Sequence, residues 1–276
     1  MKNKQVYLCQ IMEQYAADDV MVAFSGGVDS ALLLKLACEA AGKTGKKVYA
    51  VTVHTMLHPT EELEAAEKTA KEMGAIHHVL RIDELRDAQI AENPQNRCYL
   101  CKRHLFCEIR ELAEKKGISV IIEGTNEDDL HVYRPGIRAV RELKIKSPLA
   151  DANMTKDEVR ALAREYGLNI SSKPSMPCLA TRFPYGTKLS YEKLKQVNQG
   201  EMFLRKLGYR NVRIRVYGDL IRVEIDNDEM QRFVNEKDNI ISHLKGLGYS
   251  YITMDLEGFR SGSMDLQIKK YKEGRK

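Results

Sequence analysis

The first residues in this chain that could do chemistry form a glycine-rich hexad, Ser25-Gly26-Gly27-Val28-Asp29-Ser30. The hexad stands between the apolar runs at residues 20–24 and 31–34. An apolar run, a glycine turn and a helical pattern predict a strand, a loop and the first turn of a helix. Backbone N–H groups in that first turn have no partner inside the helix and favour an anion. The hexad therefore predicts a phosphate site.

The side chains of the hexad suit a nucleotide. Gly26 and Gly27 allow the backbone to approach phosphate oxygens closely, and the hydroxyls of Ser25 and Ser30 can donate hydrogen bonds. Asp29 would repel a phosphate unless a cation lay between them, so it is a candidate Mg²⁺ ligand. The spacing and the lysine of a Walker A loop are missing. The alternative interpretation is a serine cap on an ordinary helix.

Cysteines form the second candidate site. Cys98 and Cys101 make a C-x-x-C pair at the expected start of a helix, and Cys178 lies within residues 175–182. Three thiolates suit an iron–sulfur cluster in which one iron has no protein ligand. A four-ligand zinc site and a redox disulfide stay open on spacing alone. The other cysteines have apolar neighbours and are interpreted as structural: Cys9, Cys38 and Cys107.

A predicted hairpin carries the third candidate site. Its strands cover residues 212–216 and 221–225, with a Tyr-Gly-Asp-Leu turn at 217–220. Side chains alternate across a strand, so one face is apolar and the other is charged. The charged face is either a solvated sheet face or an anion site, because arginine forks fit phosphate and carboxylate. Its members are Arg213, Arg215, Arg222 and Glu224.

The elements that must position these residues alternate between strand and helix in the first half of the chain. This alternation indicates a parallel sheet covered on both faces, with ligands at the carboxyl ends of the strands. Gly124-Thr125-Asn126 follows one strand and the hexad follows another, so both should face the same rim. Strands are expected at residues 20–24, 47–53, 76–82 and 119–123, and helices at 60–73 (capped by Thr60), 98–116 and 155–166 (opened by a Thr155–Glu158 capping box).

The pattern changes after residue 186. Helical patterns at 189–207 and 228–244, the hairpin, and a strand at 249–256 predict a small α+β domain. The expected fold class is therefore an α/β parallel-sheet domain at 1–186, followed by a small α+β domain for substrate binding or oligomerisation at 187–276. Residues 174–186 form the expected connection, and the charged tail at 269–276 is expected to fray.

Length, composition and charge exclude several classes of protein. The 276 residues, 43% of them hydrophobic, suit about two domains with a sizeable core. No apolar run is long enough to cross a bilayer, and no signal-peptide pattern is visible. Six cysteines in such a chain are not a secreted disulfide framework, so the cytoplasm is the expected compartment. The net charge of +5 suits anionic ligands but is modest for a nucleic-acid-binding protein.

The hexad resembles the PP-loop ATP pyrophosphatases, which have a HUP-like fold, and later segments resemble the LarE family of that superfamily. The resemblance runs through nearly the whole chain. It implies an ATP-dependent sulfur transferase that adenylylates carboxylates of pyridinium-3,5-biscarboxylic acid mononucleotide and converts them to thiocarboxylates for the nickel-pincer nucleotide cofactor. The segments that carry it are residues 96–102, 123–126, 177–182, 212–216 and 258–263.

The resemblance also implies residue roles. Cys178 handles sulfur; with Cys98 and Cys101 it would hold a [4Fe–4S] cluster that carries an extra sulfide. Family members of the other kind have only the equivalent of Cys178 and give up its own sulfur. Asp29 is implied to act in catalysis and to bind Mg²⁺. ATP contacts are implied for Ser25, Gly26, Gly27, Asp29, Ser30, Gly124 and Thr125. Contacts with the substrate or product phosphate are implied for Arg182, Glu201, Arg213, Arg215 and Glu224.

The implied partner is a small anionic pyridinium nucleotide, without membrane or nucleic acid, and the family commonly forms homohexamers. The main alternative is a PP-loop tRNA thiolase with a [4Fe–4S] cluster, because the arginine hairpin could touch RNA phosphates. Against it, the chain has no added zinc ribbon and no basic block interleaved with aromatics. Two further alternatives stay open. One is a ligase that uses ammonia, in which the three cysteines would have no obvious function. The other is a non-catalytic nucleotide-binding protein, which would not cleave ATP.

Overall fold

The computed structural model describes residues 2–55, 57, 61–132, 134–168 and 178–260. The chain forms two compact units, and each is described by itself. The first comprises Met1–Ile90 and Asn96–Met176, and the second comprises Ala91–Gln95 and Pro177–Lys276. The predicted domain boundary at residue 186 stays a prediction; in the structure the second unit resumes at Pro177, and it also includes the short segment Ala91–Gln95.

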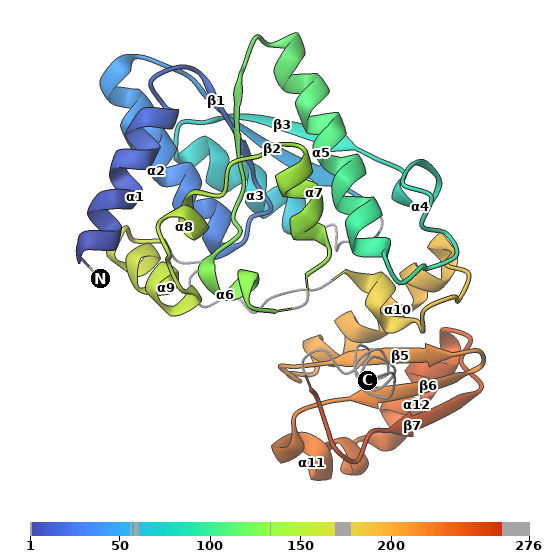
Figure 1. Cartoon of the computed structure of the whole chain (residues 1–276). Coiled ribbons are helices and arrows are strands. Elements are labelled where there is room, and N and C mark those ends of the chain that lie inside the picture. Colours follow the sequence, from blue (N-terminus) through green and yellow to red (C-terminus); the bar gives the residue numbers. More distant parts are fainter. Residues whose placement is uncertain (1, 56, 58–60, 133, 169–177, 261–276) are drawn as a thin grey trace, which may run out of the picture. The chain divides into compact units, whose positions relative to one another are not determined.

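A parallel sheet forms the centre of the first unit (Figure 1). Its strands are β1 (Val20–Ala23), β2 (Val48–His54), β3 (Ile76–Arg81) and β4 (Val120–Ile122), in the order β3-β2-β1-β4. Residues 20–22 of the central strand are fully buried, as expected for a parallel strand with helices on both sides. The predicted α/β class is confirmed.

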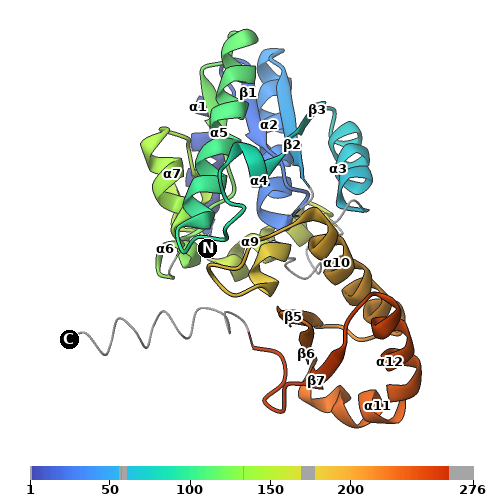
Figure 2. The ribbon, with the colours of Figure 1, turned by 90° about the vertical axis from the view of Figure 1, so that its right-hand side faces the viewer.

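Helices cover both faces of this sheet (Figure 2). On one face, α2 (Val28–Thr44) packs with α1 (Lys2–Tyr15) and α9 (Lys156–Glu165). On the other, α5 (Arg97–Lys115) and α7 (Gly136–Glu142) pack together. Shorter or peripheral helices of this unit are α3 (Glu61–Glu72), α4 (Glu84–Asp87), α6 (Glu127–Leu130) and α8 (Pro148–Asp151).

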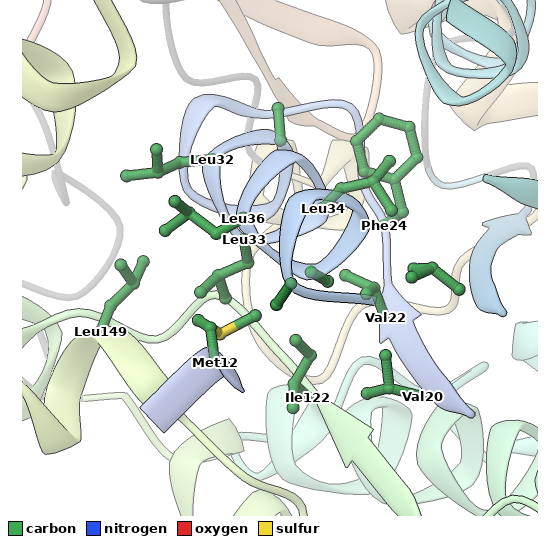
Figure 3. Packing of buried hydrophobic residues seen from close by; sticks show 14 of the residues in the cluster. Met12, Val20, Val22, Phe24, Leu32, Leu33, Leu34, Leu36, Ile122 and Leu149 are labelled. Carbon is green, nitrogen blue, oxygen red and sulfur yellow. The ribbon is translucent and has the colours of Figure 1, made fainter. Parts of the chain in front are cut away.

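The larger hydrophobic core lies between the sheet and α2 (Figure 3). Leu32, Leu33 and Leu36 of α2 share one buried cluster with Val22 of β1 and Met12 of α1. Full burial of a leucine side chain stabilises a fold by about 1.5–3 kcal/mol. The core therefore fixes the direction of α2 and holds its first turn at the carboxyl end of β1, where the hexad lies.

The second unit contains a three-stranded sheet and α10 (Tyr191–Lys206). Strand β5 (Arg213–Tyr217) pairs antiparallel with β6 (Leu220–Glu224), which pairs in parallel with β7 (Tyr251–Met254). The predicted hairpin and third strand are confirmed. Further helices of this unit are η2 (Leu179–Arg182), η3 (Asn227–Glu229), α11 (Met230–Asn235) and α12 (Lys237–Gly246).

The single helix predicted for residues 228–244 is wrong. The chain turns at Glu236, which ends α11 and begins α12 with φ −92° and ψ 8°. This break allows Phe233 on one side and Ile240 and Leu244 on the other to be buried. The sequence prediction also missed α1, although Leu8 and neighbouring apolar residues have helical spacing.

A short segment joins the second unit from far away in the sequence. Asn93 is fully buried and its Nδ2 donates to the carbonyl oxygens of Phe183 (3.1 Å) and Pro184 (2.8 Å). Backbone N–H groups of Gly186 and Leu189 donate back to the segment at 3.0 and 2.7 Å. The segment continues directly into α5, the helix that carries Cys98 and Cys101.

Some expectations fall outside the described residues. These are the cap at Thr60, residues 174–177 of the connection, residues 261–263 of one family-like segment, and the tail at 269–276. Within the described ranges, no helix has the length and apolar character needed to cross a membrane.

Candidate active site

The hexad forms a closed turn at the end of β1. Ser30 Oγ donates to the Gly27 carbonyl oxygen (3.0 Å) and accepts from the Ser25 backbone N–H (3.3 Å). Its hydroxyl also lies 3.2 Å from Ser25 Oγ. Gly27 caps α2 without a side-chain hydrogen bond from the described residues. The two serines shape the turn, while the first turn of a 17-residue helix points its backbone N–H groups outward.

Two glycines allow the loops to meet. Gly26 has φ +74°, a left-handed conformation that other residues adopt only with strain. A Cβ on Gly124 would lie 3.0 Å from Asp29 Cβ and 3.2 Å from the backbone nitrogen of Ser30. The end of β4 therefore packs directly on the first turn of α2. The prediction that both loops face one rim is confirmed.

A cavity of about 340 Å³ opens at this rim. One part is apolar, with Phe24, Val53 and Phe106 among its walls. Polar residues line the cavity as well, and ligand sites commonly combine apolar walls with a few polar groups. The polar part includes Ser25, Asp29, Ser30, Lys102, Glu123, Gly124, Thr125, Asp129 and Arg134.

Asp29 is held by two partners that sequence reasoning did not foresee. Asn126 Nδ2 donates to its Oδ1 at 3.2 Å, and Lys156 Nζ forms an ion pair with its Oδ2. Nearby, burial raises the pKa of Asp129, with a further contribution from the Asp29 charge. A lysine therefore supplies the cation beside Asp29 in this structure. The two carboxylates offer oxygen ligands of the type that Mg²⁺ prefers.

A second ion pair lies at the rim of the cavity. The Glu123 carboxylate is 5% exposed and accepts from Lys102 Nζ (3.2 Å), the Thr125 N–H (2.9 Å) and Ser147 Oγ (2.7 Å). Burial alone would raise the pKa of Glu123, but Lys102 and these hydrogen bonds together lower it. Sequence reasoning missed both partners, although Lys102 directly follows the C-x-x-C pair.

Cys98 and Cys101 lie in the first turns of α5. Three residues apart on a helix, they occupy one face, and both are free thiols. Cys101 Sγ donates to Glu84 Oε1 at 3.1 Å, and Arg97 approaches Cys98 Sγ at 3.9 Å. Glu84 is 1% exposed, and its Oε2 has no hydrogen-bond partner among the described residues. This pair of thiols suits two ligands of a shared metal centre.

Cys178 belongs to the second unit, where it caps η2. Its carbonyl oxygen accepts from Thr181 Oγ1 (2.8 Å) and from Arg182 Nη1 (3.3 Å). Among the described residues, no group of three or more His, Cys, Asp or Glu side chains is arranged to hold a metal ion. The predicted cluster would draw ligands from both units, so it stays a prediction. Burial raises the pKa of the Cys38 thiol to about 11, which agrees with its structural interpretation.

Arg213, Arg215 and Glu224 on the charged face of the hairpin are buried, while Arg222 is 32% exposed and pairs with Glu224. The solvated-face alternative is therefore wrong for most of this face. Arg215 forms two parallel hydrogen bonds with Glu224, at 3.0 and 2.9 Å, and Arg182 does the same with Glu201, at 2.7 and 2.8 Å. Both glutamates are fully buried. Burial alone would raise the pKa of Glu201, but Arg182, Arg205 and the N–H of Ile214 lower it.

Arg213 differs from its neighbours. It is 8% exposed, and no described carboxylate forms an ion pair with it. Its Nη1 donates to the Val212 carbonyl oxygen (2.7 Å), and its guanidinium lies 5.0 Å from the centre of the Phe259 ring. Burial, followed by the positive charge of Arg182, lowers the pKa of Arg213 to about 10. A buried guanidinium without a counter-ion is a site that favours an added anion.

The sequence of this chain is similar to those of several known proteins. Residues 1–133 match the model of the PP-loop domain family. A protein of Lactiplantibacillus plantarum named pyridinium-3,5-bisthiocarboxylic acid mononucleotide synthase is 37% identical over 89% of this chain and 88% of that protein. The chain belongs to the LarE family. Two proteins named only as uncharacterised are also similar. One is from Synechocystis (38% identical, covering 92% of this chain and 94% of that protein), and the other is from Methanocaldococcus jannaschii (34%, 91% and 94%).

Family membership confirms the resemblance predicted from the sequence. The structure brings the hexad together with Gly124 and Thr125, and it brings Arg182 and Glu201 into one buried network with the hairpin arginines. The roles of these residues in LarE chemistry stay predictions, as do the metal ligands.

Proposed function

We propose that the protein activates a carboxylate of pyridinium-3,5-biscarboxylic acid mononucleotide with ATP and replaces the activated oxygen with sulfur. LarE membership and the PP-loop domain identify an ATP-dependent, sulfur-transferring enzyme. The named relative supports the choice of acceptor. The structural observation that carries the proposal is Arg213, a buried cation that forms no ion pair with any described carboxylate and to which the phosphate of a mononucleotide would bind.

Activation is assigned to the rim of the first unit. A carboxylate is a poor acyl donor because its oxygen is a poor leaving group. Its oxygen attacks the α-phosphorus of ATP, the α–β bond breaks and pyrophosphate leaves. The N–H groups of the hexad and the Ser25 and Ser30 hydroxyls stabilise the departing charge. Bound Mg²⁺, for which Asp29 is the candidate ligand, would supply further charge neutralisation there.

Substrate binding is assigned to the second unit. Glu201 and Glu224 hold Arg182 and Arg215 in fixed orientations through paired hydrogen bonds. Arg213, by contrast, is buried and forms no ion pair with a described carboxylate. A dianionic phosphate fits beside Arg213, because its guanidinium can donate two hydrogen bonds to one anion.

Sulfur transfer is assigned to the cysteines. A sulfur nucleophile attacks the acyl carbon of the mixed anhydride, and AMP leaves with the carboxyl oxygen. Cys98, Cys101 and Cys178 would hold a [4Fe–4S] cluster, which when bound would supply the sulfide. The thiol pair on α5 fits two of its ligands. The two Sγ environments differ, since Cys98 is exposed and Cys101 is bound to Glu84.

The test uses protein purified without oxygen and incubated with ATP, Mg²⁺ and the pyridinium dicarboxylate nucleotide. We expect pyrophosphate, AMP and a product whose mass shows oxygen replaced by sulfur. A parallel sample contains bulk tRNA in place of the nucleotide. Pyrophosphate release that depends on tRNA alone would overturn the proposal in favour of a tRNA thiolase.

A further inference from the structure

The aromatic ring of Phe259 lies against the Arg213 guanidinium, with 5.0 Å between the guanidinium carbon and the ring centre. Both residues belong to the second unit. Arg182 and Arg215 are each oriented by a buried carboxylate through paired hydrogen bonds. Arg213 has no carboxylate partner of this kind among the described residues. The Val212 carbonyl oxygen and the Phe259 ring are the described contacts that orient its guanidinium.

The Phe259 ring is held in place by a turn that follows β7. The Phe259 backbone N–H donates to the Ile225 carbonyl oxygen at 2.7 Å, and the Gly258 N–H donates to the Asp255 carbonyl oxygen at 3.1 Å. Gly258 has φ +70°, and a Cβ at this position would collide with the Asn227 side chain. A larger residue would therefore strain the turn. These contacts fix the position of the ring without the help of Arg213.

An aromatic ring orients a cation in a different way from a carboxylate. The face of the ring carries partial negative charge and attracts a guanidinium that lies over it. The ring has no net charge, so the guanidinium keeps its positive charge for an added anion. A guanidinium also carries several N–H donors, and the ring face leaves those in the guanidinium plane available. Phe259 can therefore orient Arg213 without neutralising it.

We propose that Phe259 is a positioning residue for the anion that binds Arg213. The inference rests on the substrate-binding half of the proposed function, in which this anion is the phosphate of the pyridinium mononucleotide. Without the ring, the Arg213 side chain would have more freedom before the anion binds, and ordering it would reduce the affinity. The expected defect is in binding and not in the chemical step, because the ring acts through the phosphate end of the substrate.

Binding of ribose 5-phosphate, which represents the phosphate end of a mononucleotide, tests the inference without turnover. Isothermal titration calorimetry is performed with saturating Mg²⁺ and α,β-methylene-ATP, so that the ATP site is occupied. We expect Phe259→Leu to weaken this binding about fivefold or more, and Phe259→Tyr, which keeps the ring, to bind as the wild type does. In steady-state assays, Phe259→Leu should raise the KM for the pyridinium nucleotide by a similar factor and leave kcat unchanged.

A double-mutant cycle with Arg213→Met separates an effect that acts through Arg213 from a general structural defect. In the Arg213→Met background, Phe259→Leu should cause no further loss of binding. Tyr217→Leu is the matched control, because the Tyr217 ring lies 5.4 Å from the Arg222 guanidinium at the other end of the same hairpin. This variant should bind ribose 5-phosphate as the wild type does. Phe259→Met is a second variant without the ring, for use if leucine lowers the urea midpoint.

Two results would overturn the inference. One is wild-type affinity in a folded variant without the ring, and the other is an equal loss with and without Arg213. The proposed function fails in a different way. Ribose 5-phosphate binding that depends on Phe259 and Arg213, in a protein that makes no thiocarboxylate from the pyridinium nucleotide, would overturn the proposed function and leave the role of Phe259 intact.

Discussion

At the scale of single residues, the hairpin arginines separate into two kinds. Arg215 and Arg182 are bound to buried glutamates, whereas Arg213 has no carboxylate partner among the described residues. Removing one member of a buried ion pair leaves the other charge uncompensated, but removing an unpaired buried charge relieves a desolvation cost. The same substitution should therefore have opposite effects at Arg213 and Arg182.

We expect Arg213→Met to leave the free energy of unfolding unchanged or slightly higher, while the KM for the pyridinium nucleotide rises by about tenfold or more. Arg182→Met should lower the free energy of unfolding by about 3–5 kcal/mol. Urea unfolding and steady-state kinetics measure both. Equal destabilisation by the two variants would contradict the assignment of Arg213 as the anion ligand.

Asp29 gives a second prediction at this scale. Asp29→Ala should reduce pyrophosphate release by about 100-fold or more, with the iron and sulfide content of the anaerobic protein unchanged. Asp157→Asn, at a side chain that is 95% exposed, is the control. Pyrophosphate release at the wild-type rate in Asp29→Ala would remove the basis for metal binding at this position.

At the scale of elements, α5 carries two kinds of chemistry on consecutive residues. Cys101 donates to Glu84, and Lys102 donates to Glu123 at the rim of the cavity. Both contacts lie in the first turns of the helix, so the thiols and the nucleotide site are linked through one rigid segment. Movement of this helix end would disturb both.

The cysteines of α5 yield the third prediction. Cys98→Ala and Cys101→Ala should each abolish the brown colour of anaerobic protein and reduce turnover to at most one product per chain. Cys107→Ala, on the same helix, should keep both. Absorption spectra and product counts over many turnovers provide the measurement. Full repeated turnover by Cys98→Ala would exclude the cluster as the sulfur source.

Most helices and strands could be predicted from the sequence, because hydrophobic periodicity and helix caps can be read from short stretches of it. The predicted capping box at Thr155 and Glu158 is present, with both of its reciprocal hydrogen bonds. The same signal could not reveal that Lys156, one residue further, pairs with Asp29, which is 127 positions away. Pairings such as Glu84 with Cys101 depend on tertiary structure, and no spacing in the sequence encodes them.

Burial of the charged face of the hairpin also could not be predicted from the local sequence pattern. Alternation correctly placed Arg213 and Glu224 on one face of the hairpin, and the structure makes them direct cross-strand partners. Alternation could not show that other residues cover this face. A strand with one apolar and one polar face has the same sequence pattern whether its polar face is exposed to solvent or packed against protein. Charged residues in a strand are ordinarily exposed, and only the partner network reverses that expectation.

At the scale of the whole molecule, buried carboxylates set the response to acid. The pKa values of Glu201 and Glu123 are lowered from the ordinary value of 4.5. A group with a depressed folded-state pKa stabilises the fold above its unfolded pKa, and that stability is lost as the pH falls through the folded value. The free energy of unfolding should therefore decrease below about pH 4.5, and these two groups should not change it near neutral pH.

Urea midpoints between pH 3 and pH 8 test this fourth prediction. We expect the wild-type midpoint to fall steeply at the acid end. Glu201→Gln should be less stable at pH 7 and show a shallower acid dependence, whereas Glu114→Gln, at a side chain that is 67% exposed, should follow the wild type. An acid slope unaltered by Glu201→Gln would mean that other groups control the transition.

The buried segment around Asn93 constrains how such a protein can be divided or recombined. A gene broken at the start of the second unit would encode a C-terminal piece without Ala91–Gln95, and the carbonyls of Phe183 and Pro184 would lose their amide donor. A chimaera made with a single crossover would therefore depend on a donor like Asn93 in the other parent protein.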